Sequence, residues 1–255
     1  MKRFVLSAPP NDAGMVRLYD EDYHYLVRVR RLKTGSCFDA LLPDKTEGRV
    51  CVLSTADNIL IGKCETAFAQ SGVTPRLPVI ALFQALPKGN KMDTIVRQAA
   101  EGGVATVVPF RSRYSEAKIN AEKQRRWERI IKEARQQSGS ATETEVKTPL
   151  DFEDALAYWK SLTSRYERPV GFVLHQEPLE NRGFHDYLRC KPDFAALAVG
   201  PEGGFSPDEI TLFVSAGFKP LLMGNTVLRV DTAAAYATAA LRIILLESES
   251  WMPTG

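Results

Sequence analysis

The chain has 255 residues, of which 44% are apolar and 25% charged, and its formal net charge is +2. With this composition we expect an ordinary soluble protein that folds without disulfides or metals, and the length favours two domains over one. The longest apolar stretch, residues 233–246, is interrupted by Thr238 and Arg242 and falls short of the roughly 18 residues of a membrane span. The apolar run before Ser7 is too short for a signal peptide. We therefore expect a cytoplasmic protein with no membrane partner.

The four cysteines show no metal-binding spacing. There is no C-x-x-C pair, and with only three histidines no zinc-ligand set can be assembled. We expect no metal, and we expect buried, reduced thiols at Cys37, Cys51, Cys64 and Cys190.

The first part of the chain predicts a small β-rich domain over residues 1–72. Short strand-like runs occupy residues 37–42, 48–54 and 59–66 and are separated by turn residues. The segment 70–78, with its Gly, Ser and Pro residues, is typical of a linker. We therefore predict the domain boundary between residues 72 and 73.

From Pro78 onward the pattern changes to a βαβ unit that opens a larger domain, residues 73–255. Residues 79–85 and 104–109 are expected as strands and residues 93–101 as the helix between them. The helix is expected to end at Gly102-Gly103, and its buried stripe consists of Met92, Ile95, Val96, Ala99 and Ala100.

A second helix is predicted over residues 121–137, with a basic face. Trp127, Ile131 and Ala134 belong to its apolar stripe, and Arg125 and Arg129 lie opposite. Residues 111–135 hold nine Lys and Arg against four Asp and Glu, an excess of five. This face indicates a surface for an anionic partner, or a solvated face with ion pairs along the helix.

The remaining pattern predicts a parallel sheet covered by helices. Residues 170–174, 194–199 and 220–223 are short apolar runs typical of buried parallel strands. Ser206, Pro207 and Glu209 form the capping box of the next helix, and a last helix is expected from near Asp231 to Glu247.

Three loops follow predicted strands and are candidates for a ligand site, since ligands of open α/β sheets bind beyond the carboxyl ends of the strands. They are residues 175–178, 200–204 and 224–229. The Gly200-Pro-Glu-Gly-Gly204 loop is neither a Rossmann fingerprint nor a P-loop; it indicates a ligand site or a purely structural turn.

Arg229 and Asp231 stand where the last helix begins. Either Asp231 caps the helix and Arg229 forms a surface ion pair, or the two side chains serve a site there. Of the three histidines only His175 lies in a candidate loop, where we expect a positioning role; His185 is expected on a surface helix.

Five motifs in order along the chain resemble the 16S rRNA (uridine-N3) methyltransferase family of the SPOUT superfamily. They are the segments 85–93 (ALPKGNKMD), 101–104 (EGGV), 133–139 (EARQQSG), 200–206 (GPEGGFS) and 228–232 (LRVDT). The start, MKRF, and residues 27–35 are also similar to that family, so the likeness covers nearly the whole chain. Gly102, Ser140 and Asp231 depart from the family's usual leucine, arginine and glutamate.

The resemblance implies an α/β fold, with a knotted (trefoil) parallel-sheet methyltransferase domain preceded by a PUA-like β-barrel that binds RNA. It also implies a homodimer that uses S-adenosyl-L-methionine. Carried over by motif, the cofactor-binding residues are Leu174, His175, Glu177, Val199, Gly200, Pro201, Glu202, Gly203, Gly204, Leu222, Met223, Gly224, Asn225, Val227, Leu228, Arg229 and Thr232.

The implied substrate is 16S rRNA or the small ribosomal subunit. Arg229 is expected to stabilise charge on the uracil oxygens, and Asp231, Glu202 or water to remove the N3 proton. A 2′-O-ribose methyltransferase of the same fold and a non-catalytic assembly factor remain alternatives. The expected RNA contacts are Arg28, Arg30, Arg31, Lys88, Arg111, Arg113, Arg125 and Arg129.

Overall fold

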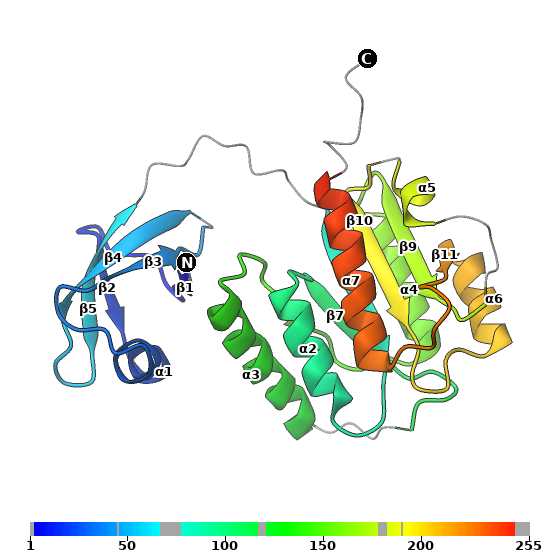
Figure 1. Ribbon diagram of the computed structural model, residues 1–255, viewed down its shortest axis with the longest axis horizontal. Helices are drawn as coiled ribbons and strands as arrows, with labels where there is room; N and C mark the ends of the chain where they lie inside the picture. Colours follow the sequence, from blue (N-terminus) through cyan, green and yellow to red (C-terminus); the bar gives the residue numbers. More distant parts are fainter. Residues whose placement is uncertain are drawn as a thin grey trace, which may run out of the picture. The chain divides into compact units, whose positions relative to one another are not determined.

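The structure is a computed structural model that describes residues 3–44, 46–66, 78–116, 121–177, 183–189 and 191–247. The chain divides into two compact units (Figure 1). One contains Met1–Val73 together with Arg135–Ala141, and the other contains Thr74–Ala134 and Thr142–Gly255. The domain boundary predicted between residues 72 and 73 lies outside the described residues.

The smaller unit is built on a five-stranded sheet in the order β1-β3-β4-β5-β2. The strands are β1 (Phe4–Val5), β2 (Met15–Leu18), β3 (Cys37–Leu41), β4 (Glu47–Ser54) and β5 (Leu60–Thr66). Between β2 and β3 the chain forms α1 (Asp20–Tyr23) and the π-helical turn η1 (His24–Val29). Phe4, Phe38 and Leu26 are buried in the core between sheet and helix. The prediction of a β-rich region is confirmed.

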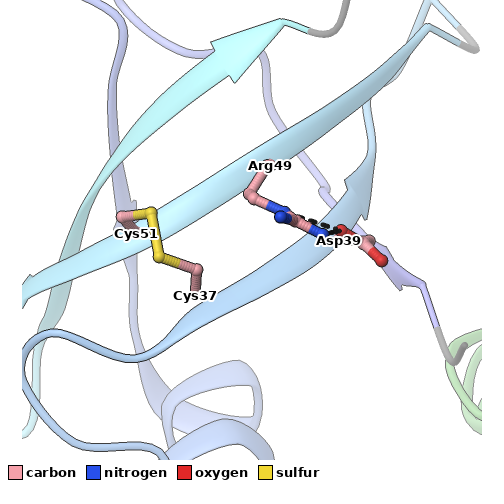
Figure 2. Close-up of a disulfide and its surroundings, with 4 residues drawn as sticks. All are labelled: Cys37, Asp39, Arg49 and Cys51. Carbon is pink, nitrogen blue, oxygen red and sulfur yellow. Dashed lines mark hydrogen bonds and ion pairs between the residues drawn. A yellow bond between two sulfur atoms is a disulfide. The ribbon is translucent and has the colours of Figure 1, made fainter.

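Cys37 and Cys51 form a disulfide, so the prediction of reduced thiols is wrong for this pair (Figure 2). The two residues lie directly opposite each other across the antiparallel β3–β4 ladder, with their Cα atoms 4.1 Å apart. Their spacing of 14 residues gave no sign of pairing, because strand register depends on the turn between the strands. Cys64 is buried and free, and burial raises the pKa of its thiol. Cys190 lies outside the described residues.

The larger unit is built on a six-stranded parallel sheet in the order β11-β9-β10-β6-β7-β8. The strands are β6 (Val79–Ala85), β7 (Thr106–Phe110), β8 (Glu145–Val146), β9 (Pro169–Leu174), β10 (Phe194–Val199) and β11 (Phe218–Leu221). Every side chain of β10 is buried. Such continuous apolar runs are typical of parallel strands that are covered on both faces.

Helices cover both faces of this sheet. Side chains of α2 (Lys91–Glu101), α3 (Ala121–Ser138), α5 (Phe184–Leu188) and α7 (Val230–Glu247) share a core with Ile80 and Leu82 of β6. Side chains of α4 (Phe152–Thr163) and α6 (Pro207–Ser215) share a second core with Ala81 and Phe83. These two residues alternate with Ile80 and Leu82 along β6, so they face the opposite side of the sheet. The unit is thus a three-layered α/β/α domain (Figure 1). Among the described residues no helix is long and apolar enough to cross a membrane.

Most predicted elements of this unit are confirmed, including the capping box of α6, in which the Ser206 hydroxyl accepts from the Glu209 N–H. Two predictions need correction. β11 ends at Leu221, so residues 222 and 223 belong to the loop that follows it. Helix α7 begins at Val230, which places Asp231 inside the first turn instead of at the N-cap.

Candidate functional site

A cavity of about 310 Å³ lies at the carboxyl ends of three adjacent parallel strands, β9, β10 and β11. The loops after these strands and the first turn of α7 form its walls. Its lining consists of Leu174, His175, Gln176, Val199, Gly200, Pro201, Gly204, Leu222, Met223, Gly224, Asn225, Thr226, Val227, Leu228, Val230 and Ala233. This edge of an open parallel sheet is where ligands bind, because the strand ends bring polar backbone groups together there.

The loop after β10 makes a tight turn along one wall. The Gly204 N–H donates to the Pro201 carbonyl at 2.9 Å, and Gly204 has a φ of +69°, in the left-handed region. A Cβ atom on Gly200 would lie 3.1 Å from the backbone of Gly204. The turn closes on itself so tightly that glycine is needed at both ends.

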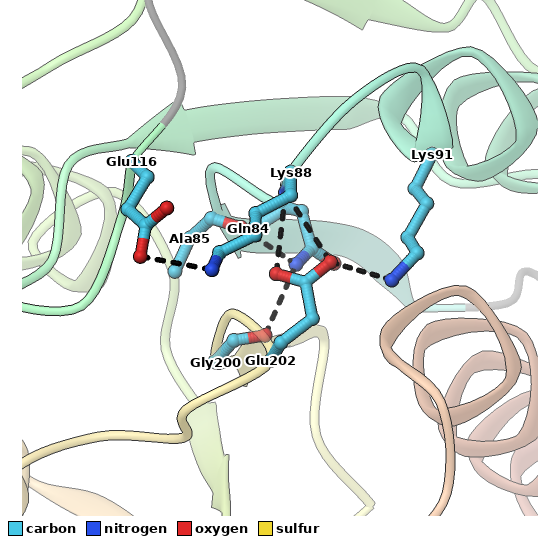
Figure 3. Close-up of polar contacts among 7 residues, drawn as sticks. All are labelled: Gln84, Ala85, Lys88, Lys91, Glu116, Gly200 and Glu202. Atoms are coloured by element: carbon cyan, nitrogen blue, oxygen red, sulfur yellow. Dashed lines mark hydrogen bonds and ion pairs between the residues drawn. The ribbon is translucent and has the colours of Figure 1, made fainter.

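Gln84 fixes the start of this turn from the neighbouring strand β6. Its side chain is fully buried, and its amide nitrogen donates to the carbonyls of Ala85 at 2.9 Å and Val199 at 3.3 Å and approaches that of Gly200 at 3.5 Å (Figure 3). The Gln84 Oε1 atom is buried and has no hydrogen-bond partner among the described residues. Gln84 therefore acts as a cross-strand tie beneath the turn.

Glu202 fixes the middle of the turn and points away from the cavity. Its carboxylate accepts from the Lys91 ammonium at 2.6 Å and from the Lys88 backbone N–H at 3.2 Å (Figure 3). Partial burial acts to raise its pKa, but the hydrogen bonds from Lys91 and from backbone N–H groups outweigh this and lower the pKa. An anion held in this way is a poor proton acceptor, so Glu202 is suited to hold the loop.

The loop after β11 is far more exposed. Val227 is 75% exposed and Leu222 is 37% exposed, although both line the cavity. Gly224 has a φ of +94°, which turns the chain back towards α7. Arg229 is exposed, and no ion pair to it is present among the described residues, so its predicted surface ion pair is not formed. Asp231 is half-buried, and its Oδ1 atom is buried without a partner there.

Five of the predicted cofactor residues do not line the cavity, although their neighbours in sequence do: Glu177, Glu202, Gly203, Arg229 and Thr232. Gly203 instead faces Tyr114, whose Cβ would lie 3.1 Å from a Cβ atom at position 203. The Glu177 N–H donates to His175 Nδ1 at 3.1 Å, and the positioning role of His175 stays a prediction.

Sequence reasoning missed the residues that support the cavity from outside its loops. Gln84 and Lys91 hold the Gly200–Gly204 turn but are far from it in sequence. A buried glutamine near the end of an apolar strand was the available signal for the first. Val230 and Ala233 of α7 also line the cavity and were not predicted, whereas Gln176 and Thr226 lie within the predicted loops 175–178 and 224–229.

The predicted RNA contacts differ in whether they are paired with acids. Lys88 pairs with Glu116 at 2.9 Å, Arg111 with Asp151 at 3.1 Å and Arg113 with Asp208 at 3.7 Å. Arg125 and Arg129 on α3 are exposed and form no ion pair within the described part of the chain. In the smaller unit Arg28 and Arg31 are exposed and Arg30 is half-buried. No cluster of acidic, histidine or cysteine side chains that could hold a metal occurs among the described residues.

The sequence is similar to known proteins over most of its length. The sequence profile of the RNA methyltransferase domain family matches residues 75–242. The chain is 31% identical to ribosomal RNA small subunit methyltransferase E of Synechocystis sp., over 95% of this chain and 78% of that protein. It is 33% identical to the protein of the same name from Aquifex aeolicus, over 81% of this chain and 85% of that one.

The fold also matches a solved structure with a bound ligand. A putative methyltransferase from Legionella pneumophila, in complex with its bound cofactor S-adenosylmethionine, superposes with a TM-score of 0.75 at 27% identity. The match covers 95% of this chain and 97% of that one.

Proposed function

Since the chain belongs to the RNA methyltransferase domain family, we propose that it transfers a methyl group from S-adenosylmethionine to N3 of a uridine in 16S ribosomal RNA. The observation that carries this proposal is the cavity at the ends of β9, β10 and β11, with the Gly200–Gly204 turn along one wall. The small ribosomal subunit or its naked RNA would be the partner, and the enzyme would act in the cytoplasm.

The lining of the cavity fits S-adenosylmethionine. Apolar side chains such as Leu174, Met223 and Leu228 suit the adenine ring, and the glycine-rich turn lets backbone groups approach the ligand. A volume of about 310 Å³ is at the lower end of the range for small-molecule sites, roughly 300–1,000 Å³. In this proposal the three loops also form the trefoil knot that the family resemblance implies.

When bound, S-adenosylmethionine supplies an electrophilic methyl group on a positively charged sulfur. Transfer forms a bond from uracil N3 to the methyl carbon and breaks the bond from that carbon to sulfur, while N3 loses its proton. Proximity supplies much of the acceleration in such a displacement, so the protein's first task is to hold the unpaired base beside the cavity.

Arg229 and Asp231 are the residues that we assign to the chemistry. Arg229 is exposed next to the cavity and unpaired among the described residues, so its guanidinium is available to the charge that develops on uracil O2 and O4. Asp231 has a buried oxygen without a hydrogen-bond partner among the described residues, and it directly follows Val230 and precedes Ala233 by two residues, both of which line the cavity. We propose it as acceptor of the N3 proton in preference to Glu202, whose carboxylate is held by Lys91.

The homodimer is a further part of the proposal, and the outer surface of α7 supports it. Tyr236, Ile243 and Leu246 are 62%, 53% and 43% exposed. Large apolar side chains exposed along one helix are typical of a surface that another molecule covers. A second copy of the chain is the partner that the family resemblance implies.

The smaller unit is assigned to RNA binding as a PUA-like domain. Arg28 lies in η1 of this unit, and Arg30 and Arg31 follow η1 before strand β3 begins. Cations on a compact β domain suit the phosphate backbone, which dominates the affinity for nucleic acids.

The test is methyl transfer to small ribosomal subunits that lack the modification, with labelled S-adenosylmethionine and analysis of the nucleosides by mass spectrometry. Label in 3-methyluridine is the expected result. Label in a ribose-methylated nucleoside would instead identify a 2′-O-methyltransferase. Tight RNA binding without any label would identify a non-catalytic assembly factor.

A further inference from the structure

The segment 86–91, which joins β6 to α2, lines a second cavity and also holds the Gly200–Gly204 turn. Through the Lys88 N–H and the Lys91 ammonium it holds Glu202 of the turn beside the first cavity (Figure 3). Through Leu86, Pro87, Gly89 and Asn90 it lines a second cavity, of about 260 Å³, whose other wall is α3. One short segment thus links the turn beside the proposed methyl-donor site to a site without an assigned ligand.

The floor of the second cavity is apolar and fixed. Leu86, Met92 and Trp127 line it and are at most 3% exposed. The indole N–H of Trp127 donates to Asp93 Oδ1 at 3.2 Å, and Arg126 pairs with Asp93 Oδ2 at 2.7 Å. Asp93 is therefore held by two groups of the wall, and the three buried apolar side chains close the bottom of the cavity without presenting a broad exposed face.

The rim of the second cavity carries more cations than acids. Lys123, Arg126 and Arg129 line it, against Asp93 and Glu122. Arg126 is engaged by Asp93, whereas Arg129 is exposed and forms no ion pair within the described part of the chain. A guanidinium that has no acid partner at the mouth of a cavity is suited to bind an anionic group of a ligand.

We propose that this second cavity binds one unpaired nucleotide of the RNA substrate, with the base between Gly89-Asn90 and α3 and a phosphate on Arg129. The volume of about 260 Å³ lies just below the usual range of roughly 300–1,000 Å³ for small-molecule sites, which fits a single nucleotide. RNA is read chiefly through unpaired bases that leave the stack. The inference rests on the proposed function, because it takes this nucleotide to be part of the same RNA substrate.

The site is tested by two variants of the full chain that alter it in different ways. Arg129→Gln removes the free cation. Asn90→Phe fills the cavity without any change of charge, and Asn90 is a suitable position because its side chain makes no capping hydrogen bond to α2. Lys160→Gln, which removes an exposed cation on α4, is the matched control for charge.

Binding of a fluorescein-labelled ten-uridine RNA is measured by anisotropy over a series of salt concentrations. We expect both cavity variants to raise the Kd about tenfold and Lys160→Gln to leave it within twofold. Arg129→Gln should also lower the slope of log K against log salt by about 0.7, as expected for one lost phosphate contact on a single strand. Asn90→Phe should leave that slope unchanged.

The proposal is overturned if the wild-type chain does not bind this RNA, or if Asn90→Phe binds it as tightly as the wild type. In the second case Arg129 would act by general attraction, and the cavity would be irrelevant. S-adenosylmethionine titrations of the same variants should give wild-type affinity. Because these are binding measurements, their result is independent of which nucleoside, if any, the chain methylates.

Discussion

Two walls of the first cavity differ in how the protein supports them. The turn Gly200–Gly204 is tied by Gln84 from below and by Lys91 and Lys88 through Glu202. The loop from Leu222 to Arg229 shows no such ties in the described residues, and its Val227 is 75% exposed. The Gly200–Gly204 wall is therefore held in place by the protein itself, whereas the Leu222–Arg229 wall presents exposed side chains.

The difference suggests a division of labour in the proposed reaction. The tied turn suits a cofactor, which must be held in the same geometry in every turnover. The uncovered loop, which ends at Arg229, suits contacts that form only when the cofactor, the substrate or a second copy of the chain is present.

Replacement of Arg229 is expected to have the largest effect. Arg229→Ala should lower kcat about 100- to 1,000-fold, as the loss of one donor to developing negative charge does in other enzymes. The affinity for S-adenosylmethionine should change less than threefold, because Arg229 does not line the cavity. Steady-state kinetics and calorimetric titration measure the two quantities. A fully active Arg229→Ala variant would refute the proposed role, and Arg229→Lys should retain part of the activity.

Loss of the tie beneath the turn should affect both stability and cofactor binding. Gln84→Leu leaves the carbonyls of Val199 and Ala85 without their buried donor, at a cost of about 1–3 kcal/mol in the free energy of unfolding. S-adenosylmethionine affinity should fall about tenfold, equivalent to ~1.4 kcal/mol. Urea denaturation and calorimetry check the two effects. Unchanged affinity in a destabilised protein would show that Gln84 supports only the fold.

The contacts of Glu202 with Lys88 and Lys91 should affect how thermal stability depends on pH. The pKa of Glu202 is lowered from 4.5, so its stabilising contribution is complete above pH 4.5 and is lost as pH falls through the lower folded-state pKa. Glu202→Gln should therefore reduce the loss of thermal stability in acid. At neutral pH it should weaken S-adenosylmethionine binding by up to about fivefold, the value of a surface ion pair of ~1 kcal/mol. A variant with the acid sensitivity of the wild type would argue against this tie.

The uncovered loop should give the smallest effect. Val227→Ser should change the free energy of unfolding by less than about 0.5 kcal/mol, because the side chain is already in water in the free chain. It should weaken S-adenosylmethionine binding about threefold if the ligand covers this apolar side chain. Leu53→Ser on β4, 50% exposed, is the matched control and should leave the affinity unchanged. If the wild type, Val227→Ser and Leu53→Ser bind S-adenosylmethionine with equal affinity, Val227 does not contact the ligand.

Much of the larger unit could be predicted from sequence because its signals are local. The run Phe194–Val199 and the box formed by Ser206 and Glu209 each specify their element within a few residues. The disulfide between Cys37 and Cys51 could not be predicted, since it depends on the β3–β4 register. The start of α7 was misplaced by one residue, because Asp231 fits an N-cap and a first helical turn equally well.

The candidate site also has some features that the local sequence predicts and others that depend on distant contacts. The glycine turn and the loops after the strands are visible in the sequence, because glycine and strand ends have direct structural meaning. The roles of Gln84 and Lys91 could not be predicted, because their contacts with residues 199–202 join segments more than a hundred residues apart in sequence. The direction of Glu202, away from the cavity, depends on those contacts.

The most direct test of the central claim is a calorimetric titration of the full chain with S-adenosylmethionine, with Gly204→Val as the comparison. Gly204 has a φ of +69°, which a β-branched side chain does not tolerate, so the substitution should deform the turn. We predict saturable binding to the wild type, and affinity lowered at least about a hundredfold, roughly 3 kcal/mol, in a variant that remains folded. Equal binding by the two proteins, or none by the wild type, would contradict the assignment of this cavity.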